Sequence, residues 1–392
     1  MRVFNCDHCG HLVFFDSVQC LHCGNALAFL PDALVMAALA PAPQQGPGLW
    51  QRVGSGGGGA LYRMCQNHTA HQACNFAVPA GDAQALCPSC RQTRLMPDVA
   101  EPAHMGRWMQ IESAKRRLYY SLARMGLAPA PGRAGPAPGR SGPVFDLLAE
   151  VPGGPPVLTG HHNGTITLNV AEADDDERAR RRIALGEPYR TLIGHLRHES
   201  GHFYWDQLVR DGGWLDDFRQ RFGDERQDYA AALEAHYAQG NDGGDWAKNH
   251  VSAYAAAHPW EDWAETWAHY LHMIDLLETS ASYATEVTVP GIYGAQHSRA
   301  VDPFGSPAPD FDTMLRHLVP LTLLLNSLTR SLGQLDAYPF ALAEQALAKL
   351  RFVHDVVHAA GQRPAAPAAA AATPLQAPAP VAPSVIKKIA KK

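Results

Sequence analysis

The sequence lacks the features that would place a chain in a membrane or in the secretory pathway. A transmembrane helix needs roughly 20 consecutive apolar residues, and the 392-residue chain has no such run. The N-terminal segment 1–6 contains no apolar signal core. Neither sign of charge dominates, because the formal net charge is −5 and the pI is about 6.5. We therefore expect a cytoplasmic protein with no membrane partner, and nucleic acid is an unfavourable partner.

Cysteine is absent after residue 90, and all eight cysteines fit zinc-binding patterns. The pairs Cys6-x-x-Cys9 and Cys20-x-x-Cys23 form two knuckles whose thiolates can close a tetrahedral site. A glycine follows each knuckle, at Gly10 and Gly24, where a positive φ lets backbone amides face sulfur. Two disulfides in a secreted module are the alternative, which the missing signal peptide disfavours. The sequence predicts a first structural zinc in a zinc ribbon over residues 1–30.

The remaining four cysteines form a looser set. Cys87-Pro-Ser-Cys90 is a tight knuckle, whereas Cys65 and Cys74 lie on a wider arm. Between these two, His68 and His71 are candidate substitutes for one ligand. We expect a second structural zinc within residues 60–95, and free or redox-active thiols are the alternative.

The remaining sequence is organised around one large domain. A Pro/Gly-rich stretch over 41–59 is expected to separate the two cysteine modules. We predict a connecting helix over 100–127, a flexible linker over 128–143, a main domain over 144–361 and a disordered Ala/Pro-rich basic tail over 362–392. Because helical patterns outnumber strands in the main domain, we expect an α+β fold that is mainly helical with a small β-sheet.

The motif His198-Glu-Ser-Gly-His202 is the strongest indication of function. On a helix of 3.6 residues per turn, the two imidazoles lie on one face and can reach one metal. Glu199 then lies beside the metal, where a general base takes a proton from a water whose pKa zinc has lowered to about 7. The run 189–208 can form one buried helix, and 165–170 alternates as a half-buried strand does. A strand along the cleft would pair with an extended peptide substrate.

A catalytic zinc of this kind needs a third protein ligand. A second predicted helix over 258–272 offers Glu261, Glu265 and His269 on one face, and only one of these can bind the metal. Pro259 suits the first turn of this helix, where Glu261 faces the favourable end of the helix dipole.

The chain resembles the bacterial zinc-binding metallopeptidases that carry an N-terminal zinc ribbon. The resemblance rests on the cysteine-bearing N-terminus, on Ile166-Thr-Leu-Asn-Val-Ala-Glu-Ala-Asp174, on Arg197-His-Glu-Ser-Gly-His-Phe-Tyr-Trp-Asp206 and on His258-Pro-Trp-Glu-Asp-Trp-Ala-Glu-Thr-Trp-Ala-His-Tyr-Leu271. It implies a zincin-like peptidase domain of the gluzincin type that cleaves a peptide or protein substrate.

A more distant likeness to the catalytic domain of anthrax lethal factor bears on individual roles. Tyr254 stands seven residues before Glu261, and Glu261-Asp-Trp-Ala-Glu265 is similar to that protein's ligand segment. The likeness implies Glu261 as the third ligand, Tyr254 as a phenol that stabilises the oxyanion, and Glu265 as a partner that orients a ligand histidine. Asp262 replaces an aromatic residue, and the spacing from the first helix is longer. Glu265 therefore stays an alternative ligand, and Tyr254 is alternatively a core tyrosine.

Two functions from different classes follow. The first is a zinc metallopeptidase with one catalytic and two structural zinc ions and Glu199 as the general base. The second is a non-catalytic scaffold or adaptor whose zinc ribbons bind a protein or nucleic-acid partner. Glu199 favours the peptidase, because a structural zinc site has no use for a base beside an open coordination position. A protein partner that binds the ribbons is compatible with both.

Overall fold

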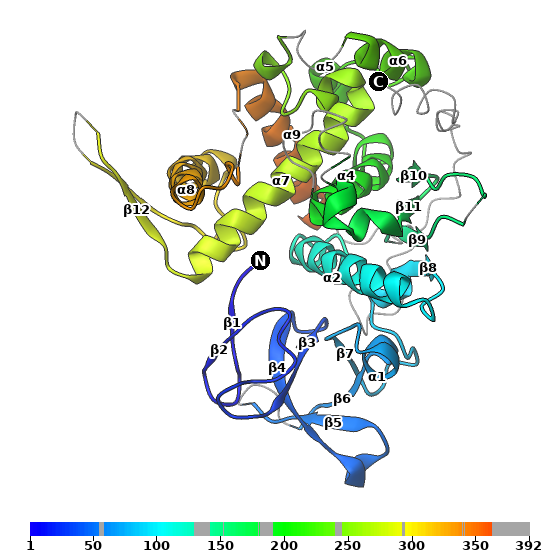
Figure 1. The fold of residues 1–392 in the computed structure, drawn as a ribbon. Coiled ribbons are helices and arrows are strands. Elements are labelled where there is room, and N and C mark those ends of the chain that lie inside the picture. Colours follow the sequence, from blue (N-terminus) through cyan, green and yellow to red (C-terminus); the bar gives the residue numbers. More distant parts are fainter. Residues whose placement is uncertain are drawn as a thin grey trace.

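The structure is a computed structural model that describes most of the chain. The described residues are 1–54, 59–128, 142–151, 153–178, 180, 191–239, 245–291, 295–338, 340 and 342–362. Most of the predicted linker and nearly all of the predicted tail lie outside these ranges. Several small sheets and many helices confirm an α+β fold in which a zinc-ribbon region precedes a larger, mainly helical domain (Figure 1).

Both cysteine modules belong to one N-terminal lobe. A hairpin of β1 (Phe4–Asn5) and β2 (Leu12–Val13) precedes a five-stranded antiparallel sheet in chain order. The strands of that sheet are β3 (Ala26–Leu30), β4 (Val35–Pro41), β5 (Leu49–Arg52), β6 (Leu61–Met64) and β7 (Ala77–Pro79). The stretch 41–59, expected to separate the modules, contains β5, which pairs with β4 and β6. One sheet therefore connects the two cysteine sets.

Helix α2 (Pro102–Arg124) lies between this lobe and the helical domain, as Figure 1 shows. Its Tyr120 ring packs edge-on against Phe4, Phe15 and Phe29 of the ribbon at centroid distances of 6.2, 5.5 and 5.8 Å. On another face, Trp108, Ile111, Leu118 and Leu122 join the core of the helical domain. The helix predicted over 100–127 is thus present, and it belongs to both cores. Short helices in the lobe are η1 (Pro43–Gln45), α1 (Gln66–His71) and η2 (Cys90–Gln92).

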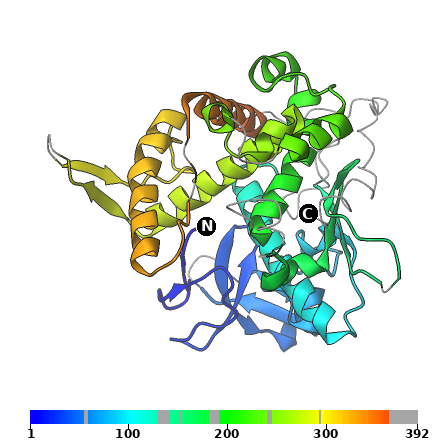
Figure 2. The same ribbon diagram turned by 45° about the horizontal axis from the view of Figure 1, so that its top comes forward.

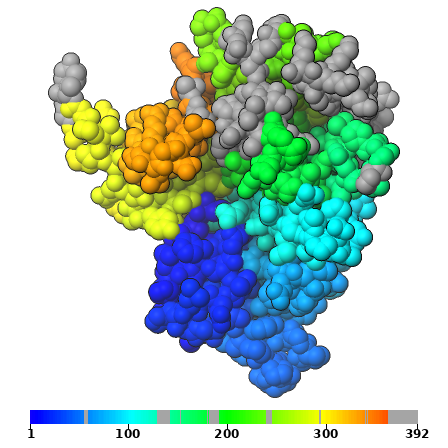
Figure 3. Space-filling view, viewed as in Figure 1, coloured from blue at the N-terminus to red at the C-terminus, as the bar shows by residue number. Residues whose placement is uncertain are grey.

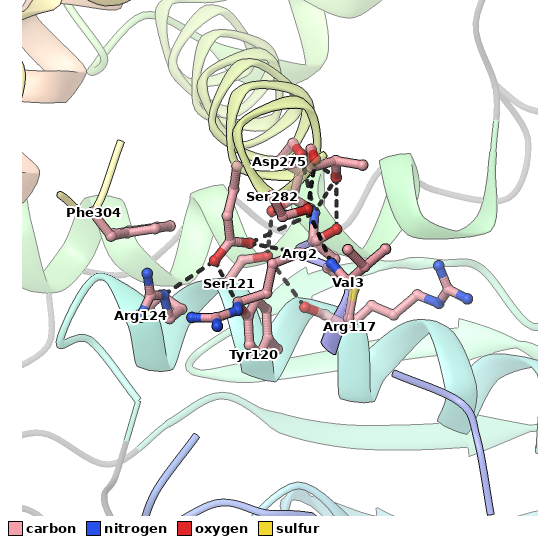
Figure 4. A network of polar contacts seen from close by, with 12 residues as sticks. Arg2, Val3, Arg117, Tyr120, Ser121, Arg124, Asp275, Ser282 and Phe304 are labelled. Carbon is pink, nitrogen blue, oxygen red and sulfur yellow. Dashed lines mark hydrogen bonds and ion pairs between the residues drawn. The ribbon is translucent and has the colours of Figure 1, made fainter. Parts of the chain in front are cut away.

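The start of the chain is tied to helix α7 (Pro259–Ser282) by a polar network around the buried Glu278 (Figure 4). The Glu278 carboxylate, 2% exposed, accepts from the Arg2 amide at 3.1 Å and from the Tyr120 hydroxyl at 2.5 Å. The Val3 amide donates to Ser282 Oγ at 3.1 Å. These bonds fix the ribbon lobe against the helix that contains the predicted third ligand.

A four-stranded sheet supports the predicted metal helix. Its order is β10 (Gly160–His162), β11 (Thr165–Asn169), β9 (Val144–Leu148) and β8 (Thr93–Leu95). Strand β11 matches the predicted strand over 165–170, but it is an interior strand that pairs with β9 in parallel and with β10 in antiparallel. The edge toward the metal helix is β10, so the expectation that 165–170 itself offers a free edge to substrate is wrong.

Two crossing helices form the centre of the large domain. Helix α4 (Leu192–Tyr204) continues into the π-helical turn η4 (Trp205–Arg210), and it packs closely on α7 (Figure 2). A Cβ added at Gly201 of α4 would lie 2.9 Å from Ala264 Cα, so only glycine allows this approach. Helix α2 packs beneath α4. The remaining elements are η3 (Val170–Ala173), α5 (Leu215–Phe222), α6 (Tyr229–Gln239), η5 (Asp245–Lys248), η6 (Tyr254–Ala257), α8 (Phe311–Ser331) and α9 (Glu344–Gln362).

A hairpin of β12 (Glu286–Val289) and β13 (Gln296–Arg299) projects from the body beside α8, and it is visible as an arm in Figure 3. It lies at the opposite end of α7 from the first-turn residue Glu261. The arm therefore takes no part in the site described below.

Candidate metal centre and active site

Helix α4 places His198 and His202 on one face, one turn apart. Thr191 caps the helix, because its side chain accepts from the Gly194 amide at 3.0 Å. The two imidazole rings are 4.9 Å apart, and both residues are buried. The predicted arrangement of the motif on a helix is therefore present.

Helix α7 begins where the third ligand is needed. His258 caps it by accepting from the Trp260 amide at 3.1 Å, and Pro259 occupies the first position. Glu261 follows in the first turn and is 1% exposed. Farther along α7, the indole N–H of Trp263 donates to the Gly201 carbonyl at 2.9 Å, which locks the two helices together.

Three donor atoms converge between the helices. Glu261 Oε2 lies 3.0 Å from His198 Nε2 and 3.5 Å from His202 Nε2. Ligands about 2.0–2.1 Å from a tetrahedral zinc are separated by about 3.3 Å, so these distances match the edges of a zinc site. Glu261 Oε2 is buried and has no hydrogen-bond partner among the described residues. A cation between the three atoms would satisfy this acceptor, so the donor set fits zinc.

Glu265 lies on the other side of the His198 ring. Its Oε1 is 2.6 Å from His198 Nδ1, and its Oε2 accepts from Ser252 Oγ at 2.6 Å. A proton on Nδ1 that is bonded to this carboxylate leaves the Nε2 lone pair free for a metal. The structure thus brings Glu261 to the donor set and Glu265 to the outer nitrogen of the same imidazole.

The charged groups of this cluster strongly shift one another's pKa values. Burial opposes protonation of His198, but the carboxylates of Glu261 and Glu265 outweigh it and raise the pKa of His198 well above its usual value. Burial likewise opposes ionisation of Glu261, yet His202 and His198 hold the pKa of its carboxyl well below the usual range. The site therefore favours ionised carboxylates with a compensating positive charge between them, which zinc would supply.

Two phenols and Glu199 line the same site. Glu199, from α4, is 6% exposed, and the Tyr254 ring from η6 lies 5.9 Å from the His198 ring. Burial, followed by the charge of Glu261, raises the pKa of Tyr254 well above 10, with a smaller contribution from Glu199. Tyr254 therefore stays protonated and able to donate. Its neighbour Tyr229, from α6, donates to Glu261 Oε1 at 2.6 Å.

Sequence reasoning missed Tyr229, Ser252 and His161. The Trp260 ring covers the His202 ring at a centroid distance of 4.0 Å. The His161 ring of β10 lies 6.1 Å from the His202 ring and nearly parallel to it. No short spacing joins Tyr229 or Ser252 to the motif, so only the fold reveals them.

The four sulfurs of the first ribbon come together as predicted. Cys6 and Cys23 Sγ are 3.8 Å apart, and Cys9 and Cys20 Sγ are 3.6 Å apart. Sulfurs about 2.3 Å from a tetrahedral zinc lie about 3.8 Å apart, whereas a disulfide is near 2.05 Å. The glycines after the knuckles both have φ of 75°, as expected.

The second quartet is fully buried. Cys74 and Cys87 Sγ are 3.8 Å apart, and the Cys87 amide donates to Cys65 Sγ at 3.3 Å. The alternative ligand His68 instead places Nδ1 2.7 Å from the Cys74 carbonyl. From α2, Arg116 Nη1 donates to the Ala73 carbonyl at 2.7 Å, which brings a buried cation beside the thiolates.

The ribbon region, the helical domain and the two-histidine, one-glutamate centre together define a zinc-binding protein of the metallopeptidase type. Residues 104–356 match the family model described as "Putative zinc-binding metallo-peptidase", and residues 3–101 match a zinc-ribbon domain. The chain belongs to this zinc-binding metallo-peptidase family.

The similarity to known proteins extends along nearly the whole chain. Proteins of Mycobacterium tuberculosis and Mycobacterium bovis, described as uncharacterized, are 38% identical over 359 residues. The aligned part covers 91% of this chain and 95% of each relative. No solved structure matches the chain. Within the described residues, no helix combines the length and the apolarity that a membrane crossing requires.

Proposed function

We propose that the protein is a zinc-dependent metallopeptidase of the gluzincin type that hydrolyses peptide bonds. His198, His202 and Glu261 would hold the zinc. When bound, zinc acts as a Lewis acid that lowers the pKa of a bound water to about 7 and polarises the scissile carbonyl. The observation that supports this most is the convergence of three buried donor atoms, in which Glu261 Oε2 lies 3.0 Å from His198 Nε2 and 3.5 Å from His202 Nε2.

The side chains around the donors have distinct tasks in this proposal. Glu199 takes the proton of the attacking water and returns it to the leaving amine. Tyr254 stays protonated and donates to the oxyanion, an interaction worth on the order of 3 kcal/mol in comparable sites. Glu265 holds His198 through Nδ1, so that Nε2 points to the metal.

The edge of the sheet offers a place for an extended peptide. Strand β10 ends the sheet order, and its His161 ring lies next to the His202 ring. A substrate strand that pairs with β10 would bring its backbone past the donor set. We therefore propose a peptide or protein substrate bound as an added strand.

We further propose that the first ribbon recruits a protein partner. Leu12, Phe14, Val18 and Leu21 are exposed on it, and Leu21 is 93% exposed. Four large exposed apolar side chains within residues 12–21 are a concentration that a protein partner would cover. Reduced thiols that form metal quartets suit a reducing compartment such as the cytoplasm.

An unbiased peptide-library digest tests the proposal. The full chain loaded with zinc is expected to cleave a subset of peptides, and Glu199→Gln is expected to keep its zinc and to lose cleavage by at least about 100-fold. A Glu199→Gln variant with full activity would exclude Glu199 as the base. A wild-type chain that holds all its zinc and cleaves nothing would favour the scaffold function.

A further inference from the structure

Tyr229 makes a direct bond to the third donor from an element outside both metal helices. It is the first residue of α6, which packs against η6. Its hydroxyl donates to Glu261 Oε1 at 2.6 Å. Its ring is held edge-on against His258 at 5.2 Å and against Trp260 at 6.0 Å. The hydroxyl is therefore placed by the contacts of the ring with two neighbouring side chains.

The bond gives the two oxygens of Glu261 different roles. Oε2 faces His198 Nε2 and His202 Nε2, and Oε1 carries the Tyr229 hydrogen bond. Glu261 is 1% exposed, so bulk solvent has little access to Oε1. A carboxylate held in this way directs Oε2 toward a cation between the histidines and keeps Oε1 turned toward the phenol.

We propose that Tyr229 is a positioning residue that keeps Glu261 a one-oxygen ligand and thereby keeps a coordination position open. The inference rests on the proposed metal centre. A catalytic zinc site needs three protein ligand atoms and an open position, and a carboxylate free to turn can bind through both oxygens and fill that position. Partners of ligand side chains also hold ligand geometry, and their loss typically costs 10–100-fold in metal affinity or activity.

A merely structural role for Tyr229 makes a different prediction. Tyr229→Phe keeps the ring contacts with His258 and Trp260 and removes only the hydroxyl. A structural role would change thermal stability and leave the metal spectrum as it is. A positioning role changes the coordination of the metal even when the fold is intact.

The test uses the full chain with Co²⁺ at the third site and zinc in both cysteine quartets. Tyr229→Phe is expected to weaken the visible absorption of the cobalt, because a higher coordination number gives weaker bands. It is also expected to lower the zinc affinity of this site by roughly 10-fold or more. Affinity is measured by chelator competition, with His202→Ala as the baseline that lacks the site. Tyr283→Phe, which alters an exposed tyrosine at the end of α7, is the matched control and is expected to resemble the wild type.

The outcomes separate this inference from the proposed function. A Tyr229→Phe chain with wild-type spectrum and wild-type affinity would overturn the positioning role. A wild-type chain that binds no third metal would overturn the metal centre, and with it this inference. Absence of peptide cleavage by a wild-type chain that holds the third metal would count against the peptidase and leave the cobalt readout of Tyr229 valid.

Discussion

Replacing Glu261 and Glu265 one at a time by glutamine tests the donor assignment sharply. Both substitutions remove one charge and keep the side-chain shape, so they differ only in position. Glu261 Oε2 lies 3.0 and 3.5 Å from the two histidine Nε2 atoms, whereas Glu265 bonds to the outer nitrogen of His198. The first change acts on the metal directly, and the second acts through an imidazole.

The expected magnitudes follow from these positions. A four-ligand zinc site binds with roughly 10–16 kcal/mol, so one ligand contributes about 3 kcal/mol, and Glu261→Gln should weaken zinc about 100-fold or more. Glutamine at 265 still accepts the Nδ1–H bond and loses only its charge, so Glu265→Gln should cost about 10-fold. Zinc affinity is measured by chelator competition on chains whose cysteine quartets are loaded.

Glu234→Gln, which alters an exposed glutamate on α6, is the control and should leave zinc affinity unchanged. Thermal unfolding of each chain shows whether a loss of zinc reflects unfolding. A larger effect at Glu265 than at Glu261, or equal effects at both, would refute the assignment of Glu261 as the ligand.

Other predictions concern the packing and the charges around the site. Gly201→Ala should destabilise the fold by about 1–3 kcal/mol in urea, because its Cβ would lie 2.9 Å from Ala264 Cα; Gly106→Ala, with open space around it, should not destabilise, and equal effects would contradict the close approach. Burial lowers the pKa of His354 to about 4, so this residue alone should lower the stability by on the order of 2 kcal/mol as the pH drops from about 6.5 to 4. Urea unfolding across that range checks this, and an equally steep fall in His354→Gln would contradict it. Arg116→Met should release zinc from the second quartet several-fold faster to a chelator, because the thiolates lose a buried cation; unchanged release would exclude this role.

Local patterns in the sequence predicted the parts of the site that depend on one element. The spacing of His198 and His202 on a helix, the Cys-x-x-Cys knuckles and the start of α7 at Pro259 are all properties of a few consecutive residues. Each is set by helix geometry or by turn conformation, so the sequence alone was sufficient.

Contacts between distant elements were not predictable in the same way. Choosing Glu261 over Glu265 depends on how α7 crosses α4, and that crossing depends on the close approach at Gly201. Tyr229 reaches Glu261 from α6, 32 residues earlier in the chain, and no periodicity connects the two. The Pro/Gly-rich stretch 41–59 was expected to separate modules, yet β5 within it pairs on both sides, because pairing with neighbouring strands can override weak local propensity.

X-ray anomalous scattering at the zinc edge, from crystals of the full chain grown with zinc, tests the central claim most directly. We predict three peaks, one in each cysteine quartet and one bound by His198 Nε2, His202 Nε2 and Glu261 Oε2 at about 2.0–2.2 Å. A third peak bound by Glu265 in place of Glu261, or no peak between the two histidines, would contradict the account.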